Sequence, residues 1–348
     1  MKVGIRVGGP ASGGREEFEA MLIYAQEAEK LGVDQAWSAE AWGMDAITPL
    51  AFLAARTERL ELGTGIMQVC ARTAASTAMT ALSMQTISGG RFLLGLGNSG
   101  PQVVEGLHGE AFDRPLTRMR ETVEVIRMAS RGEKLVVDGK RVVLPRPGGE
   151  GKALRLAHEP APLPIYLATL APRALEMTGA IADGWLGTSF TPDAAEAHLG
   201  YLRRGAEAAG RKLEDLRLLV DITVGFADDP GELIERMKAP MAFQLSAMGS
   251  PTTNFYNDAY ARAGFADTCE TVRNLWLGGD RAAAIQAVPD DMVQACNLLG
   301  DEAHVSRRLQ LYRDCGITEL NIRPMGRGAH QQLDTLGRAV ELIGQVRD

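Results

Sequence analysis

The sequence predicts an α/β protein, a (β/α)₈ barrel of parallel strands that carries two insertions. Two observations point to it. Short apolar runs alternate with amphipathic helical patterns along the chain, which is the order of parallel strands joined by crossover helices. The chain also has 348 residues, where such a barrel typically needs about 250, so room remains for inserted segments. A doubly wound open sheet is the alternative, because this pattern does not show whether the sheet closes.

Eight apolar runs predict the strands, and eight periodic segments predict the helices. The clearest helix covers 16–31, where apolar residues such as Leu22 and Ala25 recur at helical spacing and Gly32 follows as a C-cap. The predicted strands are 2–7, 34–39, 60–67, 91–96, 164–169, 184–189, 217–226 and 317–323. The other predicted helices are 47–57, 74–88, 115–131, 171–182, 192–209, 301–315 and 331–346.

Two segments do not belong to this alternation and are interpreted as insertions. Residues 133–163 contain two β-rich runs around an Asp138-Gly139 turn, which predicts a hairpin, followed by a loop rich in Pro and Gly. Residues 229–300 are mostly helical in pattern, with weak periodicity. We therefore expect one domain over residues 1–348, with insertions at about 133–163 and 229–300.

The composition excludes several classes of protein. The formal net charge is −7, hydrophobic residues make up 45% and charged residues 23%, which is typical of a globular protein and argues against binding to nucleic acid. No run of about 18 apolar residues exists, so we expect no membrane span and a cytoplasmic protein. The four cysteines show neither CxxC spacing nor a His partner, and we expect no metal site.

The residues expected at the carboxyl ends of the strands suggest the type of site. In a (β/α)₈ barrel the active site lies there, and the predicted strand ends are rich in Gly and small polar residues but poor in His, Asp and Glu clusters. Such a surface does not suit a hydrolase triad or a carboxylate pair. It suits a planar aromatic cofactor that brings its own reactivity. The GLGNSG run at 95–100 is followed by at most one turn of predicted helix and lacks the acidic residue about 20 positions on, so it does not match a dinucleotide fingerprint.

Three segments resemble the bacterial luciferase-like superfamily. They are 37–68, 87–113 with its GRFLLGLG and SGPQ runs, and 164–185. Within the superfamily they look most like the deazaflavin-dependent branch, which includes methylenetetrahydromethanopterin reductase. The resemblance implies the cofactor F420, with FMN as the alternative, and a small-molecule substrate. Relatives are commonly dimers, and the apolar helices at 47–57 and 74–88 suggest a homodimer.

The resemblance also implies which residues contact the cofactor. In relatives the third strand ends in a bulge with a cis peptide bond behind the ring, and the matching bond joins Gly65 and Ile66. The other implied contacts are Glu40 and Gln68 for the ring or ribityl chain, Asn98, Ser99 and Gln102 at the other ring edge, and Thr169, Leu170, Ala171 and Thr188 around the phosphate, close to a helix N-terminus that favours anions.

Departures from the family pattern narrow the expected chemistry. Alcohol-oxidising relatives carry a His directly after the position of Glu40, where this chain has Ala41, and the reductases carry a Glu where this chain has Arg6. We therefore expect an F420-dependent oxidoreductase that transfers a hydride and reduces an activated C=C or C=N bond. His108 and Arg6 are the candidate catalytic residues: His108 as proton donor, and Arg6 as a substrate anchor or as part of a rim ion pair with Glu40. The alternatives are an FMN-dependent monooxygenase and a non-catalytic binder of flavin or deazaflavin.

Overall fold

Eight parallel strands close into a barrel. The computed structural model describes residues 1–8, 14–249 and 253–346. Hydrogen bonding runs β1-β2-β3-β5-β8-β9-β10-β12, and β1 pairs with β12 to close the ring. The barrel strands are β1 (Lys2–Gly8), β2 (Gln35–Ala39), β3 (Glu61–Thr64), β5 (Phe92–Gly97), β8 (Ile165–Ala168), β9 (Gly184–Gly187), β10 (Arg217–Phe226) and β12 (Glu319–Pro324). All eight predicted strands are confirmed, and closure excludes the open sheet.

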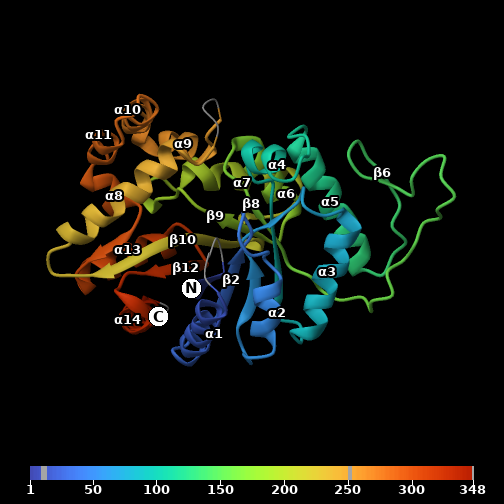
Figure 1. The fold of residues 1–348 in the computed structure, drawn as a ribbon, viewed down its shortest axis with the longest axis horizontal. Helices are drawn as coiled ribbons and strands as arrows, with labels where there is room; N and C mark the ends of the chain where they lie inside the picture. Colours follow the sequence, from blue (N-terminus) through green and yellow to red (C-terminus); the bar gives the residue numbers. More distant parts are fainter. Residues whose placement is uncertain (9–13, 250–252, 347–348) are drawn as a thin grey trace.

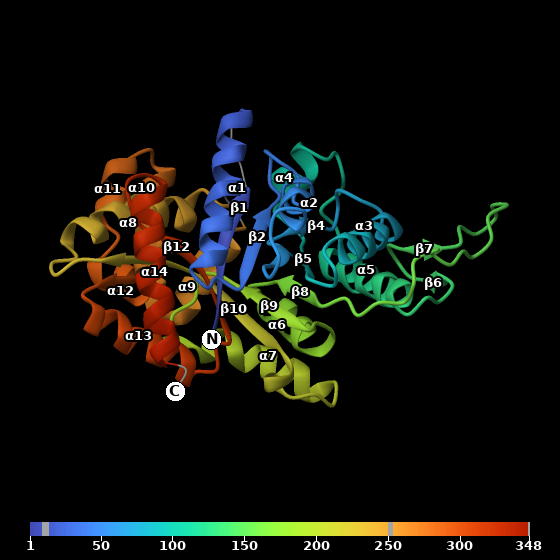
Figure 2. The same cartoon turned by 90° about the horizontal axis from the view of Figure 1, so that it is seen from below.

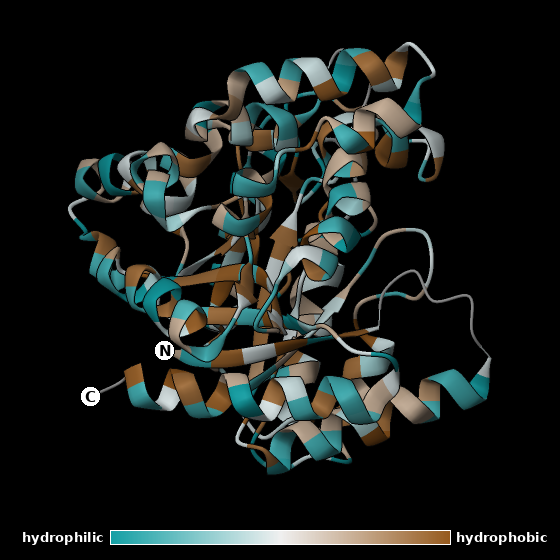
Figure 3. Cartoon of the chain, turned by 90° about the vertical axis from the view of Figure 1, so that its left-hand side faces the viewer, coloured by the Kyte–Doolittle hydropathy of each residue, from teal (hydrophilic) through white to brown (hydrophobic). Residues whose placement is uncertain are grey.

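Helices surround the barrel (Figure 1). Those at the predicted positions are α1 (Arg15–Lys30), α2 (Thr48–Ala54), α3 (Ala74–Ile87), α5 (Pro115–Ser130), α6 (Pro172–Ile181), α7 (Glu196–Ala208), α13 (Glu302–Asp314) and α14 (Gly328–Val346). A short α4 (Pro101–Gly106) follows β5. Apolar residues gather on the strands inside the ring, while the outer helix faces are largely hydrophilic (Figure 3). No helix in the described part of the chain combines the length and apolar character needed to cross a bilayer.

The two inserted segments lie on different sides of the barrel. Strands β6 (Val137–Asp138) and β7 (Val143–Leu144) pair as the expected antiparallel hairpin, and its loop extends away from the body (Figures 1 and 2). The later segment, of which residues 250–252 lie outside the described part, forms α8 (Gly231–Ser246), α9 (Phe255–Tyr260), α10 (Ala266–Leu277), α11 (Arg281–Gln286), α12 (Asp290–Ala295) and β11 (Leu298–Gly300). These helices pack around an apolar core of their own. The helical pattern gave no sign of β11, which adds to β10 in parallel.

Large aromatic side chains fill the barrel interior. Trp37 and Tyr166 meet edge to face at 5.2 Å, and Trp37 is 1% exposed. Alternation along β2 predicts that Trp37 points outward to the helices; in the structure it points into the barrel, against Tyr166. The neighbouring strand carries Gly63, where an added Cβ would lie 2.2 Å from the indole. A missing side chain on one strand therefore makes the space for a large one on the next.

A charged network closes the amino-terminal end of the barrel. Arg217 donates to the carboxylates of Glu319 and Glu61, and the Tyr166 hydroxyl donates to Glu319 at 3.2 Å. Burial raises the pKa of Glu319, while the Arg217 guanidinium opposes that rise. The Glu319 side chain is only 2% exposed. The Arg217 guanidinium therefore provides the positive charge that compensates this buried carboxylate.

The one histidine in α7 lies in the core. The helical pattern of 192–209 predicts that His198 lies on a polar face of the helix; in the structure it is fully buried against Trp185 and Phe190. Neither ring nitrogen has a hydrogen-bond partner among the described residues. Burial, together with the positive charge of Arg262, lowers the pKa of His198 to about 4.

Stability is therefore expected to fall in acid. The unfolded chain binds a proton at His198 near pH 6.5, and the folded chain only near pH 4. The stability contribution is complete above pH 6.5 and is lost as pH falls toward 4, by about 3 kcal/mol. Chemical denaturation of wild type and His198→Leu at pH 7.5 and pH 4.5 measures this. A variant as acid-sensitive as wild type would refute the assignment; His330→Leu, at an exposed position, is the control.

Candidate active site

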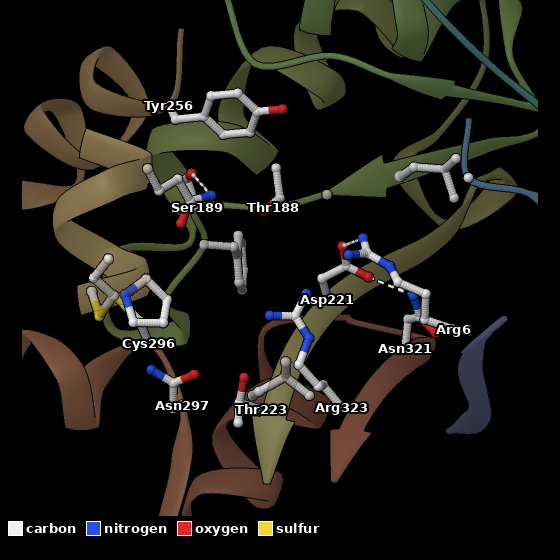
Figure 4. A pocket seen from close by; sticks show the side chains of 18 of the residues that line it. Arg6, Thr188, Ser189, Asp221, Thr223, Tyr256, Cys296, Asn297, Asn321 and Arg323 are labelled. Atoms are coloured by element: carbon white, nitrogen blue, oxygen red, sulfur yellow. Dashed lines mark hydrogen bonds and ion pairs between the residues drawn. The ribbon is translucent and has the colours of Figure 1, made fainter. Parts of the chain in front are cut away.

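A cavity of about 510 Å³ opens where the barrel strands end. Its walls come from the carboxyl-terminal halves of the strands and from helices α8 and α9 (Figure 4). The volume lies in the range of small-molecule and cofactor sites. Most of the lining is apolar, with contributions from Phe190, Leu219, Met241 and Phe243. The segment 229–300 therefore supplies one wall of the cavity, as a roof over the barrel mouth.

The bulge after β3 forms the opposite part of the wall. The bond between Gly65 and Ile66 is cis, as the resemblance implied, and both residues line the cavity. The chain then continues as β4 (Met67–Gln68), which pairs with the end of β5. Gly97 lies against Ile66, and a Cβ there would come within 2.8 Å of its side chain. The absence of a side chain at Gly97 thus lets Ile66 take its position.

A charged cluster occupies the mouths of β1, β10 and β12. Arg6 Nη2 donates to Asp221 Oδ2 at 3.0 Å, and Asn321 Nδ2 donates to Asp221 Oδ1 at 2.5 Å. Arg323 lines the cavity beside this pair (Figure 4). The alternative rim ion pair between Arg6 and Glu40 is wrong, because Arg6 turns toward β10 and Glu40 has another partner.

That partner is Arg72, in the loop before α3. Glu40 and Arg72 form a two-pronged ion pair at 2.8 and 2.9 Å, and Glu40 Oε2 also accepts from the Gln68 backbone N–H. Gln68 is fully buried, and its Oε1 lies 2.9 Å from His108 Nε2. The network joins the connections that follow β2, β3 and β5, but none of its members lines the cavity. His108 is therefore held in a loop contact outside the lining of this cavity.

The remaining predicted contacts lie in two loops. Asn98, Ser99 and Gln102 follow β5, where Ser99 has φ +59° and α4 begins; they are not among the cavity-lining residues.

Around the predicted phosphate site, the structure adds one cation. Thr188 lines the cavity, and Thr169, Leu170 and Ala171 lead into the N-terminus of α6. Arg262 Nη2 donates to the Leu170 carbonyl at 2.6 Å, and Arg262 Nε is buried with no hydrogen-bond partner in the described part.

Sequence reasoning missed most of the polar lining. The sequence patterns did not single out Asp221, Asn321 or Tyr256 as site residues. Arg323 was predicted to end the strand 317–323, with no role of its own. The signal for two of them was available: Asp221 interrupts the apolar run RLLVDITVGF, and Asn321 interrupts β12 in the same way. A polar side chain at an inward position of a barrel strand indicates a lined site. Tyr256 had no such signal, because α9 lies in the segment without a matching pattern.

The lining offers proton and hydrogen-bond donors within an apolar space. Burial raises the pKa of Tyr256, the charge of Asp221 adds to the rise and that of Arg6 opposes it. Tyr256 is therefore protonated at neutral pH. Its hydroxyl makes no hydrogen bond to any other described residue and faces the cavity (Figure 4). No group of three or more His, Cys, Asp or Glu in residues 1–8, 14–249 and 253–346 could hold a metal ion.

A closed parallel barrel with a ligand-sized cavity at the carboxyl ends of its strands is the arrangement of (β/α)₈-barrel enzymes. The chain belongs to the luciferase-like monooxygenase family, whose model matches residues 1–319.

Two curated relatives and one solved structure illustrate the similarity. The chain is 35% identical over 327 residues to Rv3520c of Mycobacterium tuberculosis, provisionally named a coenzyme F420-dependent oxidoreductase, with 91% of this chain and 93% of that protein covered. It is 28% identical over 324 residues to 5,10-methylenetetrahydromethanopterin reductase of Methanolobus tindarius, covering 92% and 94%. The structure of the F420-dependent tetrahydromethanopterin reductase of Methanopyrus kandleri matches with TM-score 0.73 and 22% identity, over 99% of this chain and 97% of that one; this last similarity is one of fold.

Proposed function

We propose that the protein is an F420-dependent oxidoreductase that transfers a hydride between the deazaflavin and a small organic substrate. The observation that carries the proposal is the cavity at the strand ends, backed by the Gly65–Ile66 bulge. The name of the Mycobacterium tuberculosis relative supports F420 as the cofactor. When bound, F420 supplies or accepts a hydride, and the protein contributes orientation and electrostatics.

The residues present fit such a cofactor. The flat ring would lie against Gly65 and Ile66, and the phosphate would lie near Thr188 and the N-terminus of α6, where backbone N–H groups favour an anion. Arg262 adds a positive charge there, and its buried Nε has a free donor position among the described groups. This assignment leaves the other implied cofactor contacts at the rim of the barrel, outside the cavity lining: Glu40, Gln68 and the loop 98–102.

The side chains of the cavity favour reduction of an activated C=C or C=N bond. Such a reduction needs a proton as well as a hydride, and the neutral Tyr256 hydroxyl is a donor in the cavity lining that makes no hydrogen bond to another described residue. The apolar walls formed by Phe190, Leu219 and Met241 exclude water from the reacting atoms. Alcohol oxidation is disfavoured, because Ala41 stands where alcohol-oxidising relatives have a His.

Titration of the purified protein with F420 and with FMN tests the proposal. We expect micromolar binding of F420, followed by its fluorescence, and weaker binding of FMN. Turnover of reduced F420 with a panel of enones and imines then separates an enzyme from a binder. Binding of FMN alone would favour the monooxygenase alternative, and an inert panel with F420 bound would favour a non-catalytic binder.

The assembly is proposed to be a homodimer formed through α2 and α3. These adjacent helices expose Phe52 (52%), Met79 (51%) and Ile87 (56%), an apolar surface that a second copy can cover. Light scattering after gel filtration is expected to give twice the mass of the 37.4 kDa chain, and Met79→Asp to shift it toward the monomer. A monomeric wild type at micromolar concentration contradicts the proposal; Leu311→Asp, on the exposed face of α13, is the control.

A further inference from the structure

Arg323 is a cation in the wall of the cavity. It stands near the end of β12, one strand from Arg6 on β1. Its guanidinium makes no hydrogen bond or ion pair with any other described residue, whereas the guanidinium of Arg6 is bonded to Asp221. Figure 4 shows Arg323 beside Asp221 with its guanidinium directed into the open space.

The charges around Arg323 do not balance. Both Asp221 oxygens are engaged, one by Arg6 and the other by Asn321. The cluster therefore contains two guanidinium groups, Arg6 and Arg323, and one carboxylate, so that its formal net charge is +1. Burial lowers the pKa of Arg323, and the charge of Arg6 lowers it further, while Asp221 opposes the change. An anion bound beside Arg323 would balance this charge.

The cavity that Arg323 lines also has apolar walls. The apolar part of the lining includes Leu219, Ile222 and the ring of Tyr256. Ile66, from the bulge after β3, lines the same cavity. A ligand that satisfies both features has a flat apolar body and one anionic end. A single guanidinium matches a carboxylate in charge and in planar two-pronged geometry, whereas a phosphate dianion would need a second free cation.

We propose that Arg323 forms the anion subsite of the substrate pocket, and that the substrate is a small conjugated carboxylate whose unsaturated body extends from Arg323 toward Gly65 and Ile66. This inference rests on the proposed function, because reduction requires the C=C bond to reach the wall assigned to the deazaflavin. In that reaction the C=C bond takes up a hydride, with its two electrons, from the reduced deazaflavin, and one proton; the carboxylate is unchanged.

Binding of an acid and its neutral amide tests the proposal without turnover. Calorimetry of the full chain, with and without F420, would use trans-cinnamate and trans-cinnamamide as probes. A hydrogen bond to a charged partner predicts about tenfold tighter binding of the acid. Arg323→Gln is expected to remove this preference and keep amide binding, and Arg323→Lys to retain part of it. Arg327→Gln, an exposed residue near the same strand end, should behave as wild type.

The outcomes separate this inference from the proposed function. If F420 binds but the acid has no advantage over the amide, or Arg323→Gln keeps that advantage, the anion subsite is refuted and the cofactor assignment stands. If F420 fails to bind while the acid keeps its Arg323-dependent advantage, the proposed function is refuted and the subsite stands. If Arg323→Gln weakens F420 and leaves cinnamate binding unchanged, the cation serves an anionic group of the cofactor, which overturns the proposal.

Discussion

Arg217→Met is expected to lower the free energy of unfolding by about 3–5 kcal/mol, because it leaves the buried Glu319 carboxylate without its compensating charge. Removal of the guanidinium lets burial raise the pKa of Glu319 further. The folded state of the variant then holds a proton more tightly than the unfolded chain does. The loss of stability is therefore largest at high pH and becomes smaller as pH falls through the raised pKa. Urea denaturation at pH 8 and pH 5 measures both effects.

Two further variants separate the charge effect from lost packing. Arg217→Met combined with Glu319→Gln removes both charges, and we expect it to be more stable than the single variant. Lys2→Met breaks a 2.8 Å ion pair to Glu61 in which the lysine side chain is 42% exposed, so its cost should stay below about 1 kcal/mol. An equal loss for Lys2→Met and Arg217→Met would mean that burial of Glu319 is not what makes Arg217 important.

Tyr256→Phe is expected to reduce kcat about 100-fold, since a positioned proton donor typically contributes 10²–10⁴-fold. Affinity for F420 should not change, because the hydroxyl is assigned to the substrate and not to the cofactor. The measurement is turnover of reduced F420 with cyclohex-2-enone, or with whichever panel member the wild type reduces most rapidly, across the pH range.

The comparison with other variants decides which group donates the proton. His108→Ala tests the original candidate, and the structure predicts a smaller loss, because His108 is bonded to Gln68 outside the cavity lining. Tyr201→Phe, at a half-buried tyrosine of α7 whose ring contacts Arg204, is the control for general effects of removing a hydroxyl. A large loss in His108→Ala with a nearly unchanged Tyr256→Phe would return the role of donor to the histidine.

Local sequence patterns predicted the elements better than the contacts between them. The helix at 16–31 could be predicted because its apolar spacing and its Gly32 stop signal are local properties of the chain. The orientation of Trp37 could not, because it depends on the space left at Gly63 of the neighbouring strand. His198 was misplaced for the same reason: its burial depends on Trp185 and Phe190, which belong to other elements.

By itself the sequence determined the alternation of strands and helices, the edge of the barrel at which a site would lie, and, through the resemblance, the bulge at Gly65 and Ile66. Only the tertiary structure decided that Arg6 pairs with Asp221 and Glu40 with Arg72, and that Arg323 and Tyr256 face one cavity. Hydrophobic periodicity and composition are properties of a single segment, so they can be identified without knowing what that segment contacts. Ion pairs and cavity walls join residues from different elements, 32 positions apart for Glu40 and Arg72 and 215 for Arg6 and Asp221, and closure of the barrel brings them together.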